Sequence, residues 1–570
     1  MDFGLIFRTV RHLKTTQVVY QVLNRVHKPR YRQYSAPKHE ALTLLTPPIP
    51  RYKSLDGDVF SFLNLDHKFT DWNYTEHGTL WTYNLNYFDY LGQESRVESL
   101  EAKTEGQEVI DATNTLDSRL LTLDRSLDSR PLTNDATAGC YWIDRFISER
   151  PSITWGMDPY PIALRGINWI KFFCRYPETA TKEREDSLYS QYKLLEKKLE
   201  YHLLGNHLLE DAYSLFIGSL YFEDKALFKK ASKLLKDQLE EQTLMDGAHY
   251  EQSPIYHCIL LDRLLDCINF GQGARGESQE SRVKGEVEVL TAIAQRMLGH
   301  LESVVWSDKT IPLLNDSANG IAPAAEQIFD YAKRLGLEWV AIPMKECGYR
   351  KMSNARMEAI VDVGNITATY QPGHTHADTL NYELRINGKP FVVDTGISTY
   401  NKNERRQYER SSAAHNCVCA LLNGKMLDSS EVWGGFRVGR RANVRVSRES
   451  HESISAEHDG YGKLCARTFT VTESSFTIED SFSGEAVSLI HLAPGVRVES
   501  QEARDRSQVS SVKSQEGNGC LIKTNMGNIL IEGADRVDIV DEKATTEYNR
   551  FEPIKVLKIY FKNHLKYTIQ

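Results

Sequence analysis

The feature that most constrains the fold of this chain is a change in its hydrophobic period near residue 356. Before that point, apolar residues recur at i, i+3, i+4 and i+7, a spacing typical of helices with one buried face. After it, apolar and polar residues alternate, as they do in strands with one buried face. Because helices come first and strands follow without βαβ alternation, we predict an α+β multidomain chain with separate α and β domains.

Seven segments with the helical pattern lie between Tyr141 and Leu337 and are joined by short polar turns. Since each apolar stripe must be buried against a neighbour, consecutive helices are expected to pair antiparallel. We therefore predict an all-helical domain over residues 141–350. The segments are residues 160–176, 183–203, 207–222, 225–241, 254–269, 284–306 and 324–336.

The alternating pattern is clearest around Asn387-Gly388, a dipeptide that favours a tight hairpin turn. Alternating segments continue to the end of the sequence, so we predict an antiparallel β-sandwich over residues 357–570. The apolar residues that flank the turn at strand spacing are Leu380, Tyr382, Leu384, Ile386, Phe391 and Val393.

Residues 1–140 are the least regular part, and we predict a helical or irregular region with a polar insertion. The first 31 residues carry apolar side chains at helical spacing, interrupted by Arg8, Arg11, His12 and Lys14. We interpret them as an amphipathic helix packed on the body of the protein, with a helix lying on a membrane surface as the alternative. The polar stretch 92–139 repeats the tetrapeptide LDSR and is expected to be a surface insertion.

Length, charge and cysteine content narrow the class of protein. A chain of 570 residues is too long for one core, and two or three domains are expected. The net charge of −8 gives no overall attraction to nucleic acid or membranes, so an acidic substrate would need a locally basic cleft. Nine cysteines without a CxxC pair predict reduced thiols. The sequence shows no signal peptide, which predicts a cytoplasmic location, with export to the periplasm by another route as the alternative. No run of about 18 apolar residues occurs, so no transmembrane span is predicted.

Polar groups gather at the predicted start of the helix GNHLLEDAYSLFIGSLYF. Asn206 is placed to cap this helix, and His207, Glu210 and Asp211 follow in its first turns. In one interpretation these residues only cap and pack. In the other, the amide and the imidazole join the free backbone N–H groups and the helix dipole in a site for an anion.

A second cluster, DGAHYEQSPIYH, places Tyr250, Tyr256 and His257 around a Ser-Pro helix start. Tyrosines beside a helix are usually amphipathic core residues. The functional interpretation is a phenol that donates a proton.

The segment around the predicted hairpin carries metal-ligating residue types. His374 and His376 are two residues apart, and Asp394 and His415 follow. Imidazole and carboxylate ligands suit zinc. The hairpin turn would pair Asp394 with about residue 381, which leaves His376 roughly 16 Å away along a straight strand. A metal site therefore requires the chain before the strand to bend back.

Basic and aromatic side chains interleave between residues 400 and 441. This mix suits stacking on sugars and pairing with carboxylates, and a solvated charged face is the alternative. The basic residues are Arg405, Arg406, Arg410, Arg437, Arg440 and Arg441, and the aromatic residues are Tyr400, Tyr408, Trp433 and Phe436.

In this order, the clusters resemble the heparinase II/III-like family of polysaccharide lyases. The resemblance runs from about Trp81 to Arg441 and includes WTYNLNYFDYL, GNHLLEDAYSLFIGSLYF, DGAHYEQSPIYH, PLLNDS, GHTHADTLNYELRINGKPFVVDTG and SSEVWGGFRVGRR. It implies an incomplete (α/α) toroid followed by an antiparallel β-sandwich, in agreement with the change of period.

The resemblance also implies roles for four residues. Asn206 and His207 are expected to neutralise a uronate carboxylate, Tyr256 to act as the catalytic acid, and His374 to complete the catalytic site.

Metal and substrate contacts are implied as well. A divalent metal, with zinc preferred over calcium or manganese, is expected on His376, Asp394 and His415. Further contacts to the substrate are expected from Glu210, Tyr250, Arg405, Arg410, Trp433 and Arg437.

We predict a lyase that cleaves an acidic, uronate-containing glycan, either glycosaminoglycan-like or a bacterial exopolysaccharide. Neutralising the carboxylate acidifies the C5 proton, because its removal pushes charge into an enolate. Tyr256 as phenolate or His374 takes this proton, and Tyr256 protonates the leaving 4-oxygen to give a 4,5-unsaturated uronate end. The alternatives are a glycoside hydrolase that uses carboxylates among Glu210, Asp211 and Glu251, and a non-catalytic glycan-binding protein of surface-polysaccharide synthesis.

Overall fold

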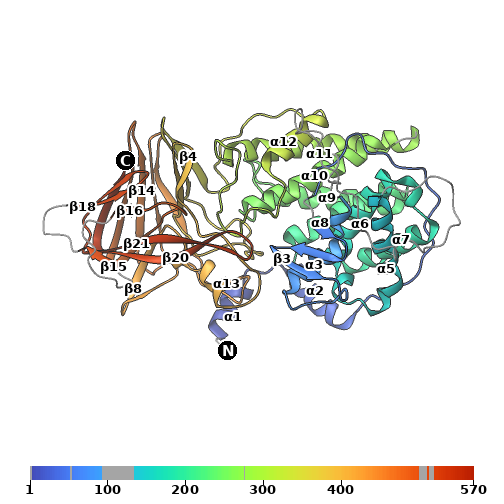
Figure 1. The fold of residues 1–570 in the computed structure, drawn as a ribbon, viewed down its shortest axis with the longest axis horizontal. Coiled ribbons are helices and arrows are strands. Elements are labelled where there is room, and N and C mark those ends of the chain that lie inside the picture. The colour runs from blue at the N-terminus through green and yellow to red at the C-terminus, as the bar shows by residue number, and fades with distance from the viewer. Residues whose placement is uncertain (1–2, 52–53, 93–133, 275–276, 500–509, 513–518) are drawn as a thin grey trace, which may run out of the picture.

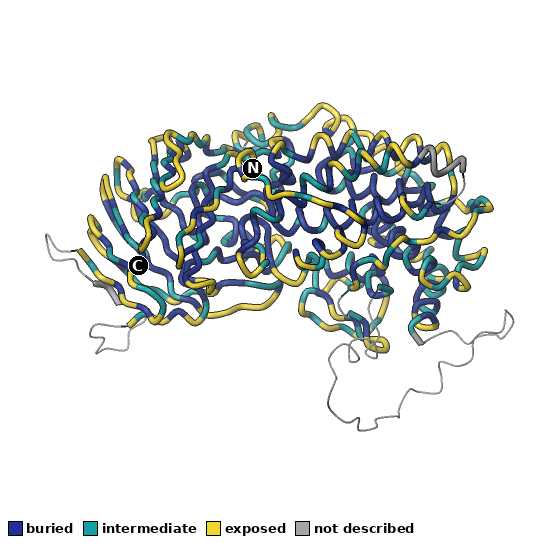
Figure 2. The backbone as a smooth tube through the Cα atoms, turned by 90° about the horizontal axis from the view of Figure 1, so that it is seen from above, coloured by how far each residue is buried: buried dark blue, intermediate teal, exposed yellow. Residues whose placement is uncertain are grey.

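A computed structural model describes residues 3–51, 54–92, 134–274, 277–499, 510–512 and 519–570. Helices form one end of the elongated molecule and antiparallel sheets the other (Figure 1). Each part has its own hydrophobic core, and Figure 2 shows buried segments in the interior of both. The predicted fold class is therefore confirmed. The LDSR repeat lies outside the described residues.

The helical part is an incomplete toroid of helix pairs. The inner helices α3, α6, α8, α10 and α12 contact one another in chain order, and α5, α7, α9 and α11 pack behind them. The bounds are α3 (Thr79–Tyr87), α5 (Asn134–Glu149), α6 (Pro159–Arg175), α7 (Lys182–Lys198), α8 (Gly205–Tyr221), α9 (Lys225–Gln242), α10 (Pro254–Gly273), α11 (Glu277–Val304) and α12 (Ala325–Arg334).

All seven predicted helices are present, as α6 to α12. Helix α5 was missed because it begins inside the polar stretch that we interpreted as an insertion. Every residue of helix α8 except His207 is buried, since the helix is rich in apolar residues and lies between α6, α9 and α10. Helix α10 begins where Ser253 Oγ accepts a hydrogen bond from the backbone N–H of Tyr256, with Pro254 in the first turn.

The β part opens with a four-stranded antiparallel sheet, β4-β5-β6-β7. The predicted hairpin joins its last two strands: Ile386 pairs with Lys389, and Asn387 (φ 51°) and Gly388 (φ 74°) form the two-residue turn. The bounds are β4 (Tyr349–Ser353), β5 (Met357–Asp362), β6 (Tyr382–Ile386) and β7 (Lys389–Val392).

A larger sheet has the order β12-β13-β14-β15-β21-β19-β18-β16, with β8, β9, β17 and β20 off this path. It shares one core with the four-stranded sheet, which makes the sandwich. Its bounds are β8 (Val418–Leu422), β9 (Lys425–Met426), β12 (Val444–Glu449), β13 (Ser453–His458), β14 (Cys465–Val471), β15 (Phe476–His491), β16 (Val498–Glu499), β17 (Ser510–Val512), β18 (Cys520–Thr524), β19 (Asn528–Glu532), β20 (Arg536–Glu547) and β21 (Arg550–Ile569).

Smaller elements complete the fold. They are the sheet of β1 (Leu55–Asp56), β2 (Val59–Phe62) and β3 (Leu65–Lys68), the pair β10 (Val432–Trp433) and β11 (Arg437–Val438), and the short helix α13 (Glu404–Glu409). Among the residues that the structure describes, no helix combines the length and the apolarity needed to cross a bilayer.

The beginning of the chain forms two helices, α1 (Phe3–Val10) and α2 (Thr15–Val26), rather than the single one expected. They pack on the body through polar contacts, and most of their apolar side chains are exposed. The prediction of a helix whose apolar face is buried on the body was wrong in this respect.

Candidate active site

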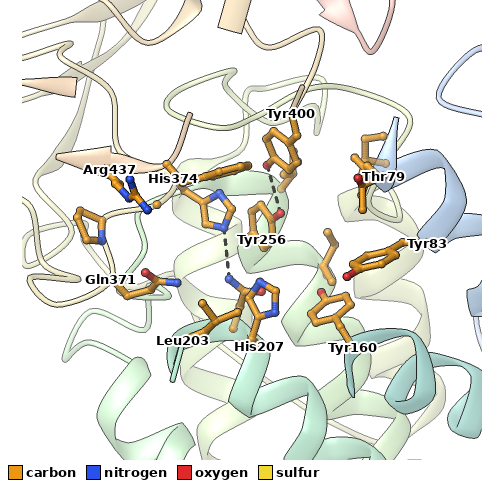
Figure 3. A pocket seen from close by; sticks show the side chains of 18 of the residues that line it. Thr79, Tyr83, Tyr160, Leu203, His207, Tyr256, Gln371, His374, Tyr400 and Arg437 are labelled. Atoms are coloured by element: carbon orange, nitrogen blue, oxygen red, sulfur yellow. Dashed lines mark hydrogen bonds between the residues drawn. The ribbon is translucent and has the colours of Figure 1, made fainter. Parts of the chain in front are cut away.

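A cavity of about 1100 Å³ lies between the toroid and the β part. Figure 3 shows that side chains from both parts point into it. The toroid lines it with residues at or near the amino-terminal ends of its inner helices: Thr79 and Tyr83 of α3, Tyr160 of α6, Asn206 and His207 of α8, and Tyr256 of α10. Helix N-termini carry free backbone N–H groups and a positive dipole end, so this arrangement favours an anion.

Asn206, Tyr256 and His374 meet in this cavity. Asn206 Nδ2 lies 3.3 Å from His374 Nε2, and the Tyr256 ring stacks on the His374 ring with centroids 3.9 Å apart (Figure 3). The Asn206 amide is held by Glu251, which accepts from its Nδ2 at 2.8 Å and from its backbone N–H at 2.9 Å. Three segments far apart in the sequence therefore supply one cluster.

The tautomer of His374 follows from its other ring nitrogen. His374 Nδ1 lies 2.8 Å from Asp316 Oδ2, so Nδ1 carries the proton and Nε2 is left as an acceptor facing Asn206. Arg406 donates two hydrogen bonds to Asp316, at 2.5 and 2.7 Å. Burial opposes ionisation of Asp316, but Arg406 outweighs it and holds the pKa of this carboxyl well below its usual value.

The Tyr256 hydroxyl is placed to donate a proton. It lies 3.2 Å from the Tyr400 hydroxyl (Figure 3), and burial raises the pKa of Tyr256 above its ordinary value. A phenol with a raised pKa stays protonated at neutral pH, as a general acid requires.

His207 lies beside this cluster and points along the cavity wall (Figure 3). Its Nδ1 is 3.1 Å from Glu200 Oε2, and its ring packs against Tyr160 with centroids 4.8 Å apart. Burial lowers the pKa of His207, but the neighbouring Glu200 carboxylate outweighs it, and the net result is a raised pKa. A protonated His207 would bring positive charge to an anionic substrate.

The backbone adopts the left-handed region just before each of these groups. Leu204 (φ 61°) and Gly205 (φ 60°) precede Asn206, Gln252 (φ 57°) precedes the cap of α10, and Asn315 (φ 55°) precedes Asp316. Positive φ is costly for residues other than glycine and tends to persist where surrounding contacts fix a functional geometry. Asn315 supplies such contacts: its Nδ2 donates to the Gln252 carbonyl and its Oδ1 accepts from His376 N–H.

The β part makes its side of the cavity basic, as an acidic substrate requires. Lys402, Arg437 and Arg441 line it together with Trp433. The Arg437 guanidinium lies over the Trp433 ring, 4.7 Å from its centroid, and Arg441 Nε has no hydrogen-bond partner among the described residues. Trp433 and Arg437, which we predicted to bind substrate, therefore line the cavity.

Four other residues that we expected to bind substrate do not line the cavity. Glu210 is fully buried beneath it, 3.8 Å from Arg263 Nε, and burial raises its pKa to about 7. The Tyr250 hydroxyl accepts a hydrogen bond from Tyr370, and Arg405 pairs with Glu409. Arg410 donates to the backbone oxygen of Thr375 at 2.8 Å, which holds the loop that carries His374. The contacts of these four residues are those of positioning or packing residues. The type of a residue alone does not show whether it packs or contacts a substrate.

The predicted metal ligands lie near one another. His415 Nδ1 is 2.7 Å from Asp394 Oδ2, and the His376 and His415 rings have centroids 5.2 Å apart. His376 Nδ1 and His415 Nε2 are buried and have no hydrogen-bond partner among the residues that the structure describes. As expected, Asp394 comes close to residue 381, since Asn381 Nδ2 donates to its carboxylate at 2.6 Å. His376 reaches this region because the loop that carries it bends before β6 begins, with Leu380 at φ 62°.

These three residues do not, however, bring three ligand atoms within 4.8 Å of one another. In the described part of the chain, the one group of His, Cys, Asp or Glu side chains that does so is Asp246, His300 and Cys347. All three are buried, and their donor types suit a metal such as zinc. The spacing of these residues in the sequence carries no motif that predicts this group.

Sequence reasoning missed Asp316, Arg406 and Tyr400 as parts of the site. Asp316 lies in PLLNDS, which contributed to the resemblance without a role, and Arg406 and Tyr400 were named only as members of a basic, aromatic segment. Glu251 was considered only as a hydrolase carboxylate, whereas it orients Asn206. Only a three-dimensional neighbour distinguishes a carboxylate that orients an imidazole from one on the surface.

Two family models match this chain: the heparinase II/III N-terminus over residues 186–334 and the heparinase II/III-like C-terminal domain over residues 339–567. Together they cover well over half of its length. The chain belongs to the heparinase II/III-like family, which confirms the resemblance drawn from the motifs.

The heparin-sulfate lyase of Pedobacter heparinus is 22% identical to this chain over 375 residues, which are 60% of the chain and 53% of the lyase. The chain thus spans about half the length of this curated relative. A crystal structure of heparinase III is similar with a TM-score of 0.55 at 15% identity, and another heparinase III structure with 0.53 at 14%. Each similarity covers 76% of this chain and 74% of the other. At these identities the solved structures support the fold alone.

Proposed function

We propose that this protein is a polysaccharide lyase that cleaves an acidic, uronate-containing glycan by β-elimination. One observation carries the proposal: the Asn206 amide, the His374 imidazole and the Tyr256 phenol converge in one cavity from three distant segments. No demand of helix packing draws these three side chains together, so their convergence favours catalysis over packing.

Recognition of the uronate carboxylate rests on the toroid side of the cavity. The N-terminal ends of α6, α8 and α10 point toward it, and Asn206 and His207 lie in the first turn of α8. The carboxylate would replace His374 or Glu251 as a partner of Asn206 Nδ2. Neutralising the carboxylate lowers the barrier to proton loss at C5, because the charge that develops there passes into the carboxylate as an enolate. The cations of the β side would hold neighbouring acidic groups of the glycan.

His374 is the base in this proposal. Its Nε2 carries a lone pair that faces Asn206 Nδ2 at 3.3 Å and would turn to the substrate, and the Asp316 carboxylate on Nδ1 stabilises the imidazolium that forms when Nε2 takes the C5 proton. The C5–H electrons form the C4–C5 double bond, and the C4–O4 bond breaks. Tyr256 donates its proton to the departing oxygen, and its phenolate is then reprotonated from the His374 imidazolium or from water. Burial raises the pKa of Tyr256, which favours donation by the phenol over a phenolate base.

The arrangement does not favour the hydrolase alternative. A hydrolase needs two carboxylates about 5–9.5 Å apart that face the sugar. Glu210, Asp211 and Glu251 are all buried, and none of the three lines the cavity. Asp211 accepts from the backbone N–H of Glu200, and Glu251 is occupied by Asn206.

We further propose that His376, His415 and Asp394 hold a divalent ion, preferably zinc. The two buried imidazole nitrogens without partners support this assignment, because a buried polar atom that forms no hydrogen bond is costly unless a ligand satisfies it. When bound, the ion would act structurally, tying the loop that carries His374 to the start of β8. The residues Asp246, His300 and Cys347 form an alternative group with suitable donors.

The substrate class can be tested on purified protein. We expect incubation with a panel of acidic polysaccharides, including heparan sulfate, chondroitin sulfate and bacterial exopolysaccharides, to produce ultraviolet absorbance of unsaturated uronate with at least one of them. New reducing ends without this absorbance would mean hydrolysis. Binding of a panel member without either product would mean a non-catalytic glycan-binding protein.

A further inference from the structure

Helices α1 and α2 present apolar faces to solvent, the reverse of what a surface helix normally does. On α1 the exposed apolar residues recur at i, i+4 and i+7, and on α2 at i, i+1, i+4, i+5 and i+8, so each set forms one face. They are Phe3, Phe7 and Val10 on α1, and Val18, Val19, Val22, Leu23 and Val26 on α2. Phe3 is 84% exposed and Val26 77%, so the body of the protein leaves these faces largely uncovered, although Val10 also borders the cavity.

The opposite faces of both helices are held by polar contacts. Arg8 pairs with Glu431 at 2.7 Å, and Thr9 Oγ1 accepts a hydrogen bond from Trp433 Nε1 at 3.0 Å. On α2, Gln17 Nε2 donates to the backbone oxygen of Leu203 at 3.1 Å. The apolar faces are therefore not needed to dock the helices and are free to contact something else.

The charge of this segment identifies the partner. Residues 3–38 contain eight Lys and Arg residues and no Asp or Glu, in a chain whose net charge is −8. Five of these basic residues are exposed and lie in the sequence on α2 or just after α1 or α2: Arg11, Arg25, Lys28, Arg30 and Arg32. A second copy of the same basic surface would be repelled, whereas an anionic lipid surface would be attracted.

We propose that α1 and α2 bind the surface of an anionic membrane. Their apolar faces would enter the headgroup region, and the neighbouring Arg and Lys side chains would contact acidic lipid headgroups. The same segment supplies Ile6, Leu13 and Gln17 to the wall of the cavity, so the bound membrane would lie beside the active site.

Flotation of the full-length protein with lipid vesicles tests this proposal. Wild type should float with vesicles of phosphatidylglycerol and phosphatidylcholine, bind more weakly at high salt, and remain unbound with phosphatidylcholine alone. V22D/L23D alters only exposed apolar side chains and should lower partition at least about tenfold. R25Q/K28Q should lower it about fivefold for each charge removed.

The control is V340D, which introduces one carboxylate of the same kind at a side chain that is 78% exposed but far along the chain from α1 and α2. It should float like wild type, and thermal unfolding should show that all variants are folded. Wild type that does not float, or V22D/L23D that floats as well as V340D, would overturn the proposal. A wild-type dimer that V22D/L23D converts to monomers, without vesicle binding, would assign the face to a second copy instead. No glycan is used, so the result is independent of lyase activity.

Discussion

At the scale of single residues, the site is organised around His374. Its Nδ1 is fixed by Asp316, its Nε2 faces Asn206, and its ring stacks on Tyr256. Asp316 is itself held by Arg406. Each of these contacts fixes either where the imidazole lies or which nitrogen carries its proton, and a base needs both.

Replacing Tyr256 by Phe tests the acid directly. The change removes one hydroxyl and keeps the ring that stacks on His374, so the melting temperature should change little. Because the leaving oxygen loses its proton donor, we expect kcat to fall by about 10²–10⁴-fold. Steady-state kinetics on the best substrate of the panel measures this. Tyr250→Phe, which removes a buried hydroxyl outside the cavity, is the control and should stay within about tenfold of wild type; a Y256F enzyme in the same range would exclude Tyr256 from the mechanism.

Glu210 makes the stability of the protein depend on pH. Its pKa is raised from 4.5 to about 7 in the folded state, chiefly by burial. The folded state therefore holds this proton more tightly than the unfolded state, and wild type loses stability as pH rises from about 4.5 through 7. Glu210→Gln cannot ionise, so its melting temperature relative to wild type should increase across that pH window. Melting curves at several pH values measure this difference, and Glu178→Gln at an exposed position should show no such trend; an E210Q difference that is flat with pH would contradict a raised Glu210 pKa.

At the scale of elements, the inner helices act through their first turns. Helices α3, α6, α8 and α10 each direct their N-terminal end to the cavity, and α8 and α10 bear Asn206 and Tyr256 there. The turns before α8 and α10 contain positive-φ residues, so the entry of the chain into each helix is tightly specified. A small change in such a turn should move Asn206 or Tyr256, which we propose to be catalytic, without unfolding the toroid.

Gly205 is the position where this can be measured. Its φ is 60°, and a Cβ there would collide with Glu251 Oε1 and approach Gln371 Cγ. Gly205→Ala should therefore displace the carboxylate that holds Asn206 and reduce kcat/KM at least about tenfold. Gly336→Ala is the matched control, because Gly336 has φ 76° and nothing within 4 Å of a new Cβ. Both variants should lose about 1 kcal/mol of stability from the strained backbone, but only G205A should lose activity; equal kinetics for the two would contradict the assigned role of Glu251.

The same elements show what the sequence can and cannot predict. Helices α6 to α12 and the β6–β7 hairpin follow from local periodicity and from the Asn387-Gly388 turn. The outward faces of α1 and α2 could not be predicted, because periodicity marks an apolar stripe but not what covers it. The sequence could not show that Asn206 lines the cavity and Glu210 does not, because both are buried residues near the start of the same helix.

At the scale of the whole molecule, the proposed catalysis would depend on how the toroid meets the β part. Asp316 comes from the segment between α11 and α12, while His374 and Arg406 come from the β part. Such a long-range set leaves no local pattern in the sequence, so only the resemblance to a family gave His374 a catalytic role, and no role was predicted for Asp316.

Metal content tests the proposed ion between His376 and His415. We expect purified wild type to contain about one zinc per chain at this site, measured by atomic emission. His376→Ala and His415→Ala should each lower the content by about one ion per chain, since each removes an imidazole ligand. Cys347→Ser removes a donor of the other candidate group and should leave that ion in place. Unchanged zinc in both histidine variants, with a loss in C347S, would move the metal to Asp246, His300 and Cys347.

The central claim is β-elimination at the Asn206, Tyr256 and His374 cluster, and product masses test it most directly. A defined oligosaccharide of the best substrate should be cut by wild type into fragments whose masses add up to that of the substrate, with one fragment carrying a 4,5-unsaturated uronate. His374→Ala, which removes the base, should leave the oligosaccharide intact under the same conditions. Fragments that together are heavier than the substrate by one water would show hydrolysis and contradict the mechanism, and unsaturated fragments from H374A at the wild-type rate would contradict the assignment of the base.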